Sequence, residues 1–379
     1  MTTLKDLQTP ALILDAGRLD RNLERMAAKA RSLGVALRPH LKTSKCWDVA
    51  RRQLTTPQGP ATVSTLKEAE YFASHGVKDM IYAVGIAPAK LARVAAVNAQ
   101  GADLKVIFDN EAAGRAISDF CERQGVRIRA LLEIDCDGHR SGLRPESPEL
   151  IEVAKSLRPG SGAELAGVLT HAGGSYNATS PEDIRRRAHE ERDGVVRAAE
   201  RLRAAGLPCP IVSVGSTPTA TFGDNLEGVT ELRCGVYAFF DLFMLGLGVC
   251  RQSDLALSVL VTVIGHQKEK NWVITDGGWM ALSRDRGTAS QKLDQGYGLV
   301  ADISGEPVPE DLIVVSANQE HGIISSRDGS AFDLERYPVG TMLRIFPNHA
   351  CPTAAQHPQY YVVDDGTEVR AVWPRIYGW

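Results

Sequence analysis

The segment RPHLKTSK contains the side chain best suited to covalent chemistry on a carbonyl compound. The segment overlaps the end of the candidate strand 35–40 and continues beyond it, so Lys42 is expected at the C-terminal end of that strand. A lysine there, partly desolvated and close to Lys45, can have a lowered pKa and attack an aldehyde. Lysines in loops are common, so the spacing alone favours two solvated loop residues.

Two further segments place polar side chains after candidate strands. In EIDCDGHRSG, Arg140 can face a ring nitrogen or a carboxylate, or it can form an ion pair with Asp135 or Asp137. In LTHAGGSY, His171 and Tyr176 can line a pocket. A buried, hydrogen-bonded histidine is the commoner explanation for a single residue of this kind.

The segment VSVGSTPTA has the local chemistry of a phosphate site. A candidate strand stops at Gly215, and Ser216 and Thr217 then supply hydroxyls and backbone N–H groups. Glycine permits close approach of a backbone, and barrel enzymes often bind phosphate on their late loops. The alternative is an ordinary helix N-cap and turn; we favour the phosphate site.

The segment PNHACPT places His349 and Cys351 two residues apart. On a strand both side chains would point to one face, a spacing that can chelate a metal. Two ligands are too few for a structural zinc site, but they leave positions open for water and substrate. The motif alone favours a packed cysteine beside a surface histidine, and the polar stretches 283–292 and 317–323 are interpreted as solvated turns.

The order of elements predicts an α/β fold in which these motifs end successive strands. Amphipathic helices are expected over residues 18–33 and 180–206, the second with Ser180 as N-cap and Pro181 in its first turn. Candidate strands cover residues 11–15, 35–40, 61–65, 104–109, 128–135, 165–171, 210–215 and 231–237.

About eight strand–helix alternations favour a (β/α)8 TIM-type barrel over residues 11–250. A doubly wound open sheet is the alternative, but it would gather its ligand at one reversal of strand order. Residues 251–379 contain β-rich runs separated by turn residues, which predict a C-terminal antiparallel β domain.

Composition limits the class of partner. The 379-residue chain has a formal net charge of −3 and no basic run, so nucleic acid is not expected. No apolar run approaches the length of a membrane span, and we see no signal peptide. Seven scattered cysteines suit a reduced compartment, and we expect a cytoplasmic protein.

The ordered set RPHLKTSK, VSTLKEAE, EIDCDGHRSG, LTHAGGSY, VGSTPTA, ANQEHG and PNHAC resembles the fold type III, alanine racemase-like enzymes that use pyridoxal 5′-phosphate (PLP). Within them it resembles the D-serine dehydratase and D-threonine aldolase branch, which acts on D-β-hydroxy amino acids. The resemblance covers nearly the whole chain. It implies a barrel followed by a β domain that also includes residues 1–10.

The resemblance also implies a role for each motif. The PLP-binding lysine falls on Lys42, which would also be the base that removes the α-proton. Arg140 falls near the pyridine nitrogen, and the metal ligands fall on His349 and Cys351. The remaining cofactor-binding positions, which line the ring or the phosphate, fall on His171, Tyr176, Gly215, Ser216, Thr217 and Tyr237.

The metal motif and the substrate class follow from the same resemblance. Dehydratases of the branch tend to have His-x-Cys and aldolases His-x-Asp, so Cys351 favours a dehydratase. A thiolate ligand favours zinc, or manganese or cobalt, as the divalent metal, and the expected substrate is D-threo-3-hydroxyaspartate. D-serine dehydratase, an aldolase, a racemase and a PLP-binding homeostasis protein are the alternatives, and a homodimer is expected.

Overall fold

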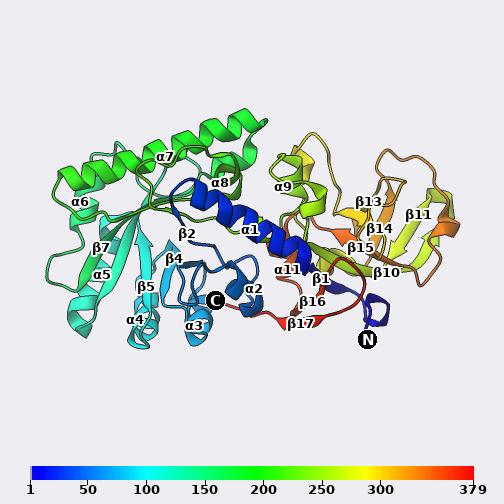
Figure 1. Ribbon diagram of the computed structural model, residues 1–379, viewed down its shortest axis with the longest axis horizontal. Helices are drawn as coiled ribbons and strands as arrows, with labels where there is room; N and C mark the ends of the chain where they lie inside the picture. Colours follow the sequence, from blue (N-terminus) through cyan, green and yellow to red (C-terminus); the bar gives the residue numbers. More distant parts are fainter. Residues whose placement is uncertain (1) are drawn as a thin grey trace. The chain divides into compact units, whose positions relative to one another are not determined.

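The computed structural model describes residues 2–379, which fold as two compact units (Figure 1). The barrel unit consists of Arg25–Gly235 together with Gly378–Trp379. The β unit consists of the N-terminal segment up to Glu24 together with Val236–Tyr377. Within residues 2–379 there is no disulfide, and no helix there is long and apolar enough to cross a membrane.

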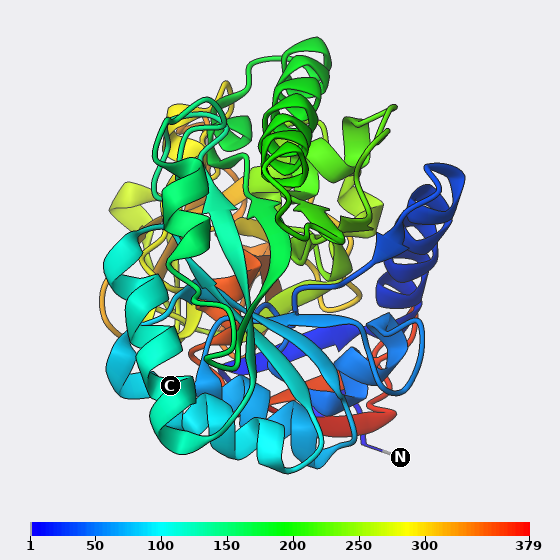
Figure 2. The same cartoon turned by 90° about the vertical axis from the view of Figure 1, so that its left-hand side faces the viewer.

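The barrel unit is built on a sheet of parallel strands (Figure 2). The described residues contribute eight of them: β2 (Ala36–Leu37), β3 (Ala61–Val63), β4 (Asp79–Gly85), β5 (Asp103–Phe108), β6 (Ile128–Ile134), β7 (Ala163–Thr170), β8 (Ile211–Val214) and β9 (Glu231–Leu232). The spatial order is β2-β9-β8-β7-β6-β5-β4-β3. Backbone bonds from Thr62 N–H to Pro39 O and from Leu41 N–H to Thr62 O, both 2.9 Å, join the two ends. The predicted barrel is therefore confirmed.

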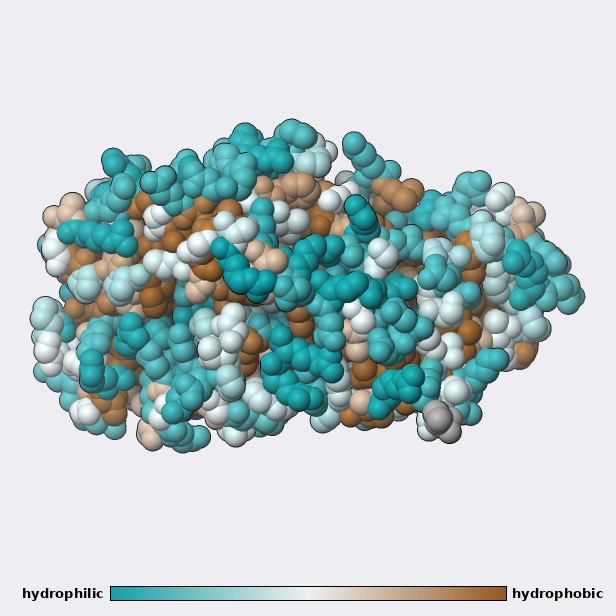
Figure 3. All heavy atoms as spheres, viewed as in Figure 1, coloured by the Kyte–Doolittle hydropathy of each residue, from teal (hydrophilic) through white to brown (hydrophobic). Residues whose placement is uncertain are grey.

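Helices alternate with these strands. They are α2 (Trp47–Gln53), α3 (Leu66–Ser74), α4 (Leu91–Ala99), α5 (Glu111–Gln124), α6 (Leu150–Lys155), α7 (Pro181–Ala204) and α8 (Thr217–Phe222). The predicted start of α7 is confirmed, because the Ser180 side chain accepts the Asp183 N–H and Pro181 is the first helical residue. The outer face of α7 is rich in Arg and Glu, and this surface is mostly hydrophilic in Figure 3.

A closed antiparallel barrel forms the centre of the β unit. Its strands are β10 (Leu257–Gln267), β11 (Trp272–Thr275), β12 (Leu299–Ala301), β13 (Leu312–Ala317), β14 (Gly322–Ser326) and β15 (Met342–Phe346). β10 pairs with both β11 and β15, which closes the ring. β16 (Gln359–Val363) and β17 (Ala371–Pro374) extend the sheet. The short helix α9 (Leu242–Gly246) precedes β10, and the short helices α10 (Trp279–Leu282) and α11 (Ala350–Ala354) lie between strands of the sheet.

The division between the units differs from the predicted one. We expected a boundary at residue 250 and only residues 1–10 in the β domain; the structure divides the chain after Gly235 and extends the N-terminal part to Glu24. β1 (Ala11–Asp15) is therefore not a barrel strand: it pairs antiparallel with β10 and parallel with β16. All five residues of β1 are buried, and a strand buried on both faces has the same sequence pattern in either kind of sheet. Helix α1 (Ala16–Ser32) follows it and contains the boundary.

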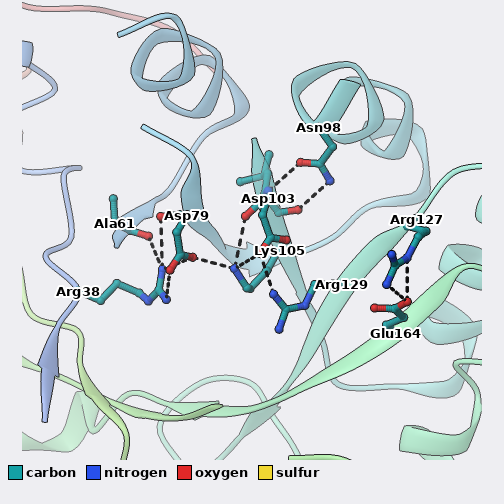
Figure 4. A network of polar contacts seen from close by, with 10 residues as sticks. Arg38, Ala61, Asp79, Asn98, Asp103, Lys105, Arg127, Arg129 and Glu164 are labelled. Atoms are coloured by element: carbon teal, nitrogen blue, oxygen red, sulfur yellow. Dashed lines mark hydrogen bonds and ion pairs between the residues drawn. The ribbon is translucent and has the colours of Figure 1, made fainter. Parts of the chain in front are cut away.

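The N-terminal end of the parallel barrel is held by a network of charges (Figure 4). Arg38 donates to Glu231 at 2.8 Å and to both carboxylate oxygens of Asp79 at 2.9 and 3.0 Å. Lys105 contacts Asp79 at 2.7 Å and Asp103 at 2.6 Å. Burial alone would raise the pKa of Asp79, but Arg38 and Lys105 hold it down to about 2. The network ties together the starts of β4, β5 and β9.

Candidate active site

The predicted lysine lies where the barrel enzymes place their chemistry. Lys42 is exposed in the turn that follows β2, and its backbone N–H lies 3.5 Å from Nδ1 of His40. Burial, and then the charges of Lys42 and Arg233, push the pKa of His40 well below its usual value. Burial and the charges of Lys42, Arg233 and Arg140 act on His171 in the same direction. The structure thus gathers these residues in one electrostatic cluster.

His171 is held as a neutral ring. Its Nδ1 donates to the carbonyl oxygen of Gly215 at 2.6 Å, and because that oxygen only accepts, the proton resides on Nδ1. Burial first, and the neighbouring cations second, lower its pKa to about 3. The ring lies 6.1 Å from that of Tyr176, measured between centroids. The structure therefore bears out the buried, hydrogen-bonded histidine, and the role of His171 in lining a pocket stays a prediction.

The depressed pKa of His171 predicts acid sensitivity of the cofactor-free protein. His171 takes up a proton near pH 6.5 in the unfolded chain but only near pH 3 in the folded protein. The contribution of His171 to the free energy of unfolding is therefore fully present above pH 6.5 and is lost as the pH falls towards 3. The expected loss is roughly 1.4 kcal/mol per pH unit for this group. Urea unfolding at pH 7 and pH 5 measures it. His171→Gln should have a shallower pH dependence; equal dependence in both proteins would contradict the assignment.

The segment after β8 forms the N-cap and turn that we gave as the alternative, and the phosphate site stays a prediction. Ser216 is the N-cap of α8, and its hydroxyl accepts the Thr219 N–H at 3.3 Å. At Gly215 a Cβ atom would lie 2.3 Å from the carbonyl oxygen of Arg233, so only glycine fits there. The Oγ1 atom of Thr217 is buried and has no hydrogen-bond partner within residues 2–379.

Unpaired buried polar atoms indicate what this site accepts. Besides Thr217 Oγ1, Nε of Arg233 is buried without a partner among the described residues. Such atoms are rare in native structures and usually mean that a ligand, ion or water completes the bonding. A hydroxyl donor and a guanidinium N–H both suit acceptor atoms such as phosphate oxygens or a ring nitrogen. The residues present therefore fit PLP.

Two arginines lie near this cluster, and only one of them was predicted. Arg140 is mostly exposed, and its Nη2 lies 3.7 Å from Glu133, not from Asp135 or Asp137 as the ion-pair alternative assumed. Arg233 is buried at the end of β9, and its Nη2 donates to the Thr170 carbonyl at 2.6 Å. Nothing in the segment ELRCGVY distinguished Arg233 from an ordinary strand residue.

The metal motif lies in the β unit, but not on a strand. His349 is the N-cap of α11, and Cys351 lies in the first turn of this helix. The expectation of a shared strand face is wrong: Pro352 suits a first helical turn, where a backbone N–H is not needed, and Asp241 accepts the Ala350 N–H at 3.0 Å. Burial opposes protonation of His349, but Asp285 and Cys351 raise its pKa to about 11.

The contacts around His349 would suit a metal ligand. Its Nδ1 lies 2.8 Å from Oδ2 of Asp285, which leaves Nε2 for a metal. Metal-binding histidines almost always donate their other ring N–H to a carboxylate or carbonyl. Asn348 Nδ2 donates to the Asp285 carbonyl at 3.0 Å and fixes this loop. The stretch 283–292, interpreted as a solvated turn, thus supports His349.

A complete protein cage is absent. Within residues 2–379, no group of three or more His, Cys, Asp or Glu side chains is placed to hold a metal ion. The donor set of His349 and Cys351 fits a site that keeps positions open for other ligands. Tyr237, predicted to contact phosphate, is a buried residue of the short 3₁₀ helix Val236–Ala238 and belongs to the β unit.

Family models match both units. Residues 14–242 match the alanine racemase N-terminal domain, and residues 256–363 match a serine dehydratase domain. The chain belongs to the alanine racemase-like family of enzymes, in the branch that contains the D-serine dehydratases. The fold agrees: an alanine racemase of Clostridium difficile has a TM-score of 0.68 at 12% identity, over 98% of this chain and 99% of its own.

Full-length relatives refine this placement. The D-threo-3-hydroxyaspartate dehydratase of Delftia sp. (strain HT23) is 51% identical over 100% of this chain and 99% of its own. Its solved structure has a TM-score of 0.96 and covers 100% of both chains, and a mutant of that enzyme has been solved in a metal-free form. The D-serine dehydratase of Dictyostelium discoideum is 30% identical over 97% of this chain and 96% of its own.

Proposed function

We propose that the protein is a PLP- and divalent-metal-dependent dehydratase that converts D-threo-3-hydroxyaspartate to oxaloacetate and ammonia. The full-length identity to the Delftia dehydratase, together with Lys42, His349 and Cys351 in place, carries the proposal. The barrel unit would hold PLP and the β unit would hold the metal, on His349 and Cys351. Zinc, manganese or cobalt suits a site with a thiolate and an imidazole.

The two groups supply what side chains lack. Bound PLP supplies an electron sink that makes the α-proton of an amino acid acidic. A bound divalent metal supplies a Lewis acid for the departing β-hydroxyl. In the net reaction one water leaves and another is taken up in hydrolysis, so the substrate loses ammonia.

Lys42 performs two tasks in this proposal. Its Nζ would hold the cofactor through the aldehyde and, as a neutral amine, would take the α-proton of the substrate. Lys42 is the exposed residue of an otherwise buried turn after β2, so its side chain can move between the tasks. Burial keeps His171 neutral, and because its one proton lies on Nδ1 toward Gly215 it has none on Nε2 to donate, so it would support the cofactor ring by packing.

The two arginines suit different tasks. Arg233 is buried and anchored to the Thr170 carbonyl, so it suits a fixed position beside the cofactor. Arginine does not give up its proton, so a ring nitrogen facing it stays unprotonated. Arg140 is mostly exposed and weakly paired at 3.7 Å, so it suits a mobile substrate carboxylate as well as the ring nitrogen expected from the resemblance.

The remaining cofactor positions complete the proposal. The phosphate positions that the resemblance implies are Gly215, Ser216, Thr217 and Tyr237: Gly215 would allow close backbone approach, and the Thr217 hydroxyl would be the donor, since it has no partner within residues 2–379. Tyr176 would line the ring beside His171. We also propose a homodimer, in keeping with the fold class.

Product analysis tests the assignment. The protein loaded with PLP and zinc or manganese is incubated separately with D-threo-3-hydroxyaspartate, D-serine and D-threonine. We expect oxaloacetate and ammonia from the first substrate, and less 2-oxo acid from the other two. Glycine and an aldehyde as the products would make the protein an aldolase, the activity of 3-hydroxy-D-aspartate aldolase of Paracoccus denitrificans, which is 29% identical over 97% of this chain and 92% of its own.

A further inference from the structure

Helix α7 buries one carboxylate that the proposed reaction does not use. Glu191 is 2% exposed, although α7 otherwise directs most of its charged side chains to solvent. Burying a carboxylate is costly unless hydrogen bonds compensate it. A glutamate that remains in such a position therefore needs specific partners.

Glu191 has three such partners, all of them donors. Its Oε1 accepts the backbone N–H groups of Ala172 and Gly215, both at 3.0 Å. Its Oε2 accepts the hydroxyl of Thr219 at 2.6 Å. The first donor follows β7 and the other two follow β8, so this one carboxylate joins two different loops of the barrel unit.

These loops are the ones that carry the candidate cofactor contacts. Ala172 directly follows His171, and Gly215 directly precedes the Ser216–Thr217 segment. Both backbone polar groups of Gly215 are engaged: its N–H donates to Glu191, and its carbonyl oxygen accepts a hydrogen bond from Nδ1 of His171. The Gly215 N–H is therefore not available to bind phosphate, so the donors for phosphate must come from the Ser216–Thr217 segment that follows it.

We propose that Glu191 is a positioning residue that holds the His171 loop and the Ser216–Thr217 loop at the spacing required to bind both ends of PLP. The inference rests on the proposed cofactor. PLP presents a ring to one loop and a phosphate to the other, so a fixed spacing lets both contacts form together. When the hydrogen bonds of Glu191 are weakened, we expect the phosphate contacts to lose more of their contribution to the free energy of PLP binding than the ring contacts.

A carboxylate suits this task better than an amide. All three partners of Glu191 donate, and a carboxylate is an acceptor only. In Glu191→Gln one acceptor becomes an NH2 group, which either faces a backbone N–H or forces the Thr219 hydroxyl to turn. Because Thr219 Oγ1 also lies 2.9 Å from Ser216 Oγ, the change reaches the predicted phosphate segment.

The test compares PLP with pyridoxal, which lacks the phosphate. Cofactor-free wild type, Glu191→Gln and the control Ser118→Ala are titrated with each compound, and the absorbance of the lysine-bound cofactor gives both Kd values. We expect the ratio of the pyridoxal Kd to the PLP Kd to fall on the order of 10-fold in Glu191→Gln, the effect of one hydrogen bond to a charged group.

Ser118 is the matched control, because it is a buried side chain that also links separate segments by hydrogen bonds but lies outside the candidate site. Its hydroxyl is fully buried in the barrel unit, donates to the Ser156 carbonyl at 3.1 Å and accepts the Arg158 N–H at 2.9 Å. Ser118→Ala should lower the thermal midpoint and leave the Kd ratio unchanged. An unchanged ratio in folded Glu191→Gln overturns the inference, because a purely structural residue would lower only stability.

Two further outcomes are decisive. If Glu191→Gln does not fold, Glu191→Asp keeps the carboxylate but shortens the side chain by one methylene group, so it cannot reach all three donors, and the ratio must fall in that variant for the inference to stand. If wild type binds neither compound, the proposed function itself is wrong. The failure of the inference and the failure of the proposed function are therefore distinguishable.

Discussion

Lys42→Ala should lose the absorbance of a lysine-bound cofactor and nearly all turnover. In the proposed function the substitution removes both the Nζ atom that would hold the cofactor aldehyde and the base that would take the α-proton, and a general base alone contributes up to about 10⁴-fold in rate. Spectra of the PLP-loaded protein and assays of oxaloacetate formation measure the two effects. Borohydride reduction followed by peptide mass mapping identifies the lysine in wild type.

Lys45→Arg is the matched control for Lys42→Ala. Lys45 lies in the same segment, and its Nζ is 3.2 Å from the buried carboxylate of Glu68. Arginine keeps the charge that this carboxylate needs, so the variant should fold and keep its cofactor absorbance. A lysine-bound cofactor that persists in Lys42→Ala would show that another lysine holds PLP.

Cys351→Ala should retain PLP while losing its metal. Removing the thiolate leaves His349 as the one remaining candidate ligand of the motif, and changes even at groups behind the ligands cost 10–100-fold in affinity, so we expect at least about 10-fold weaker binding. Titration with cobalt measures the affinity, and the thiolate-to-cobalt absorption band should disappear. Dehydration should fall with it, since the hydroxide leaves with metal assistance.

Cys250→Ala provides the comparison for Cys351→Ala. Cys250 is a buried thiol of the β unit outside the metal motif, so its removal deletes the same atom type without removing a candidate ligand. Its cobalt spectrum should match that of wild type. Unchanged cobalt affinity in Cys351→Ala would exclude the thiolate as a ligand. Turnover that survives complete chelation would refute the metal-assisted elimination.

The sequence predicts the elements better than their partners. Alternating strands and helices predict the barrel, and turn-separated β runs predict the second unit, because both patterns are local. The strand Ala11–Asp15 was assigned to the wrong sheet since its burial on both faces suits either one. β4 was missed among the candidate strands, although Asp79 at its start anchors the charge network.

The residues that hydrogen-bond to the candidate site residues could not be predicted from local sequence patterns. Asp285 meets His349 across 64 residues, and Glu191 meets Gly215 across 24. No periodicity links such positions, because the contacts exist only after the sheets have closed. Lys42, His171 and the Gly215–Thr217 segment are predicted as site residues because each follows a strand end, and barrel topology places those ends together.

The charge network at the base of the barrel also bears on how the lysine turn is ordered. Arg38 lies four residues before Lys42, and it is bound to Glu231 and Asp79 while the backbone of Pro39–Leu41 closes the ring. The conformational entropy of this segment is therefore lost when the chain folds, not when the cofactor arrives. In the proposed function PLP would therefore meet a preorganised turn, and little of its binding free energy would be needed to order the backbone that presents Lys42.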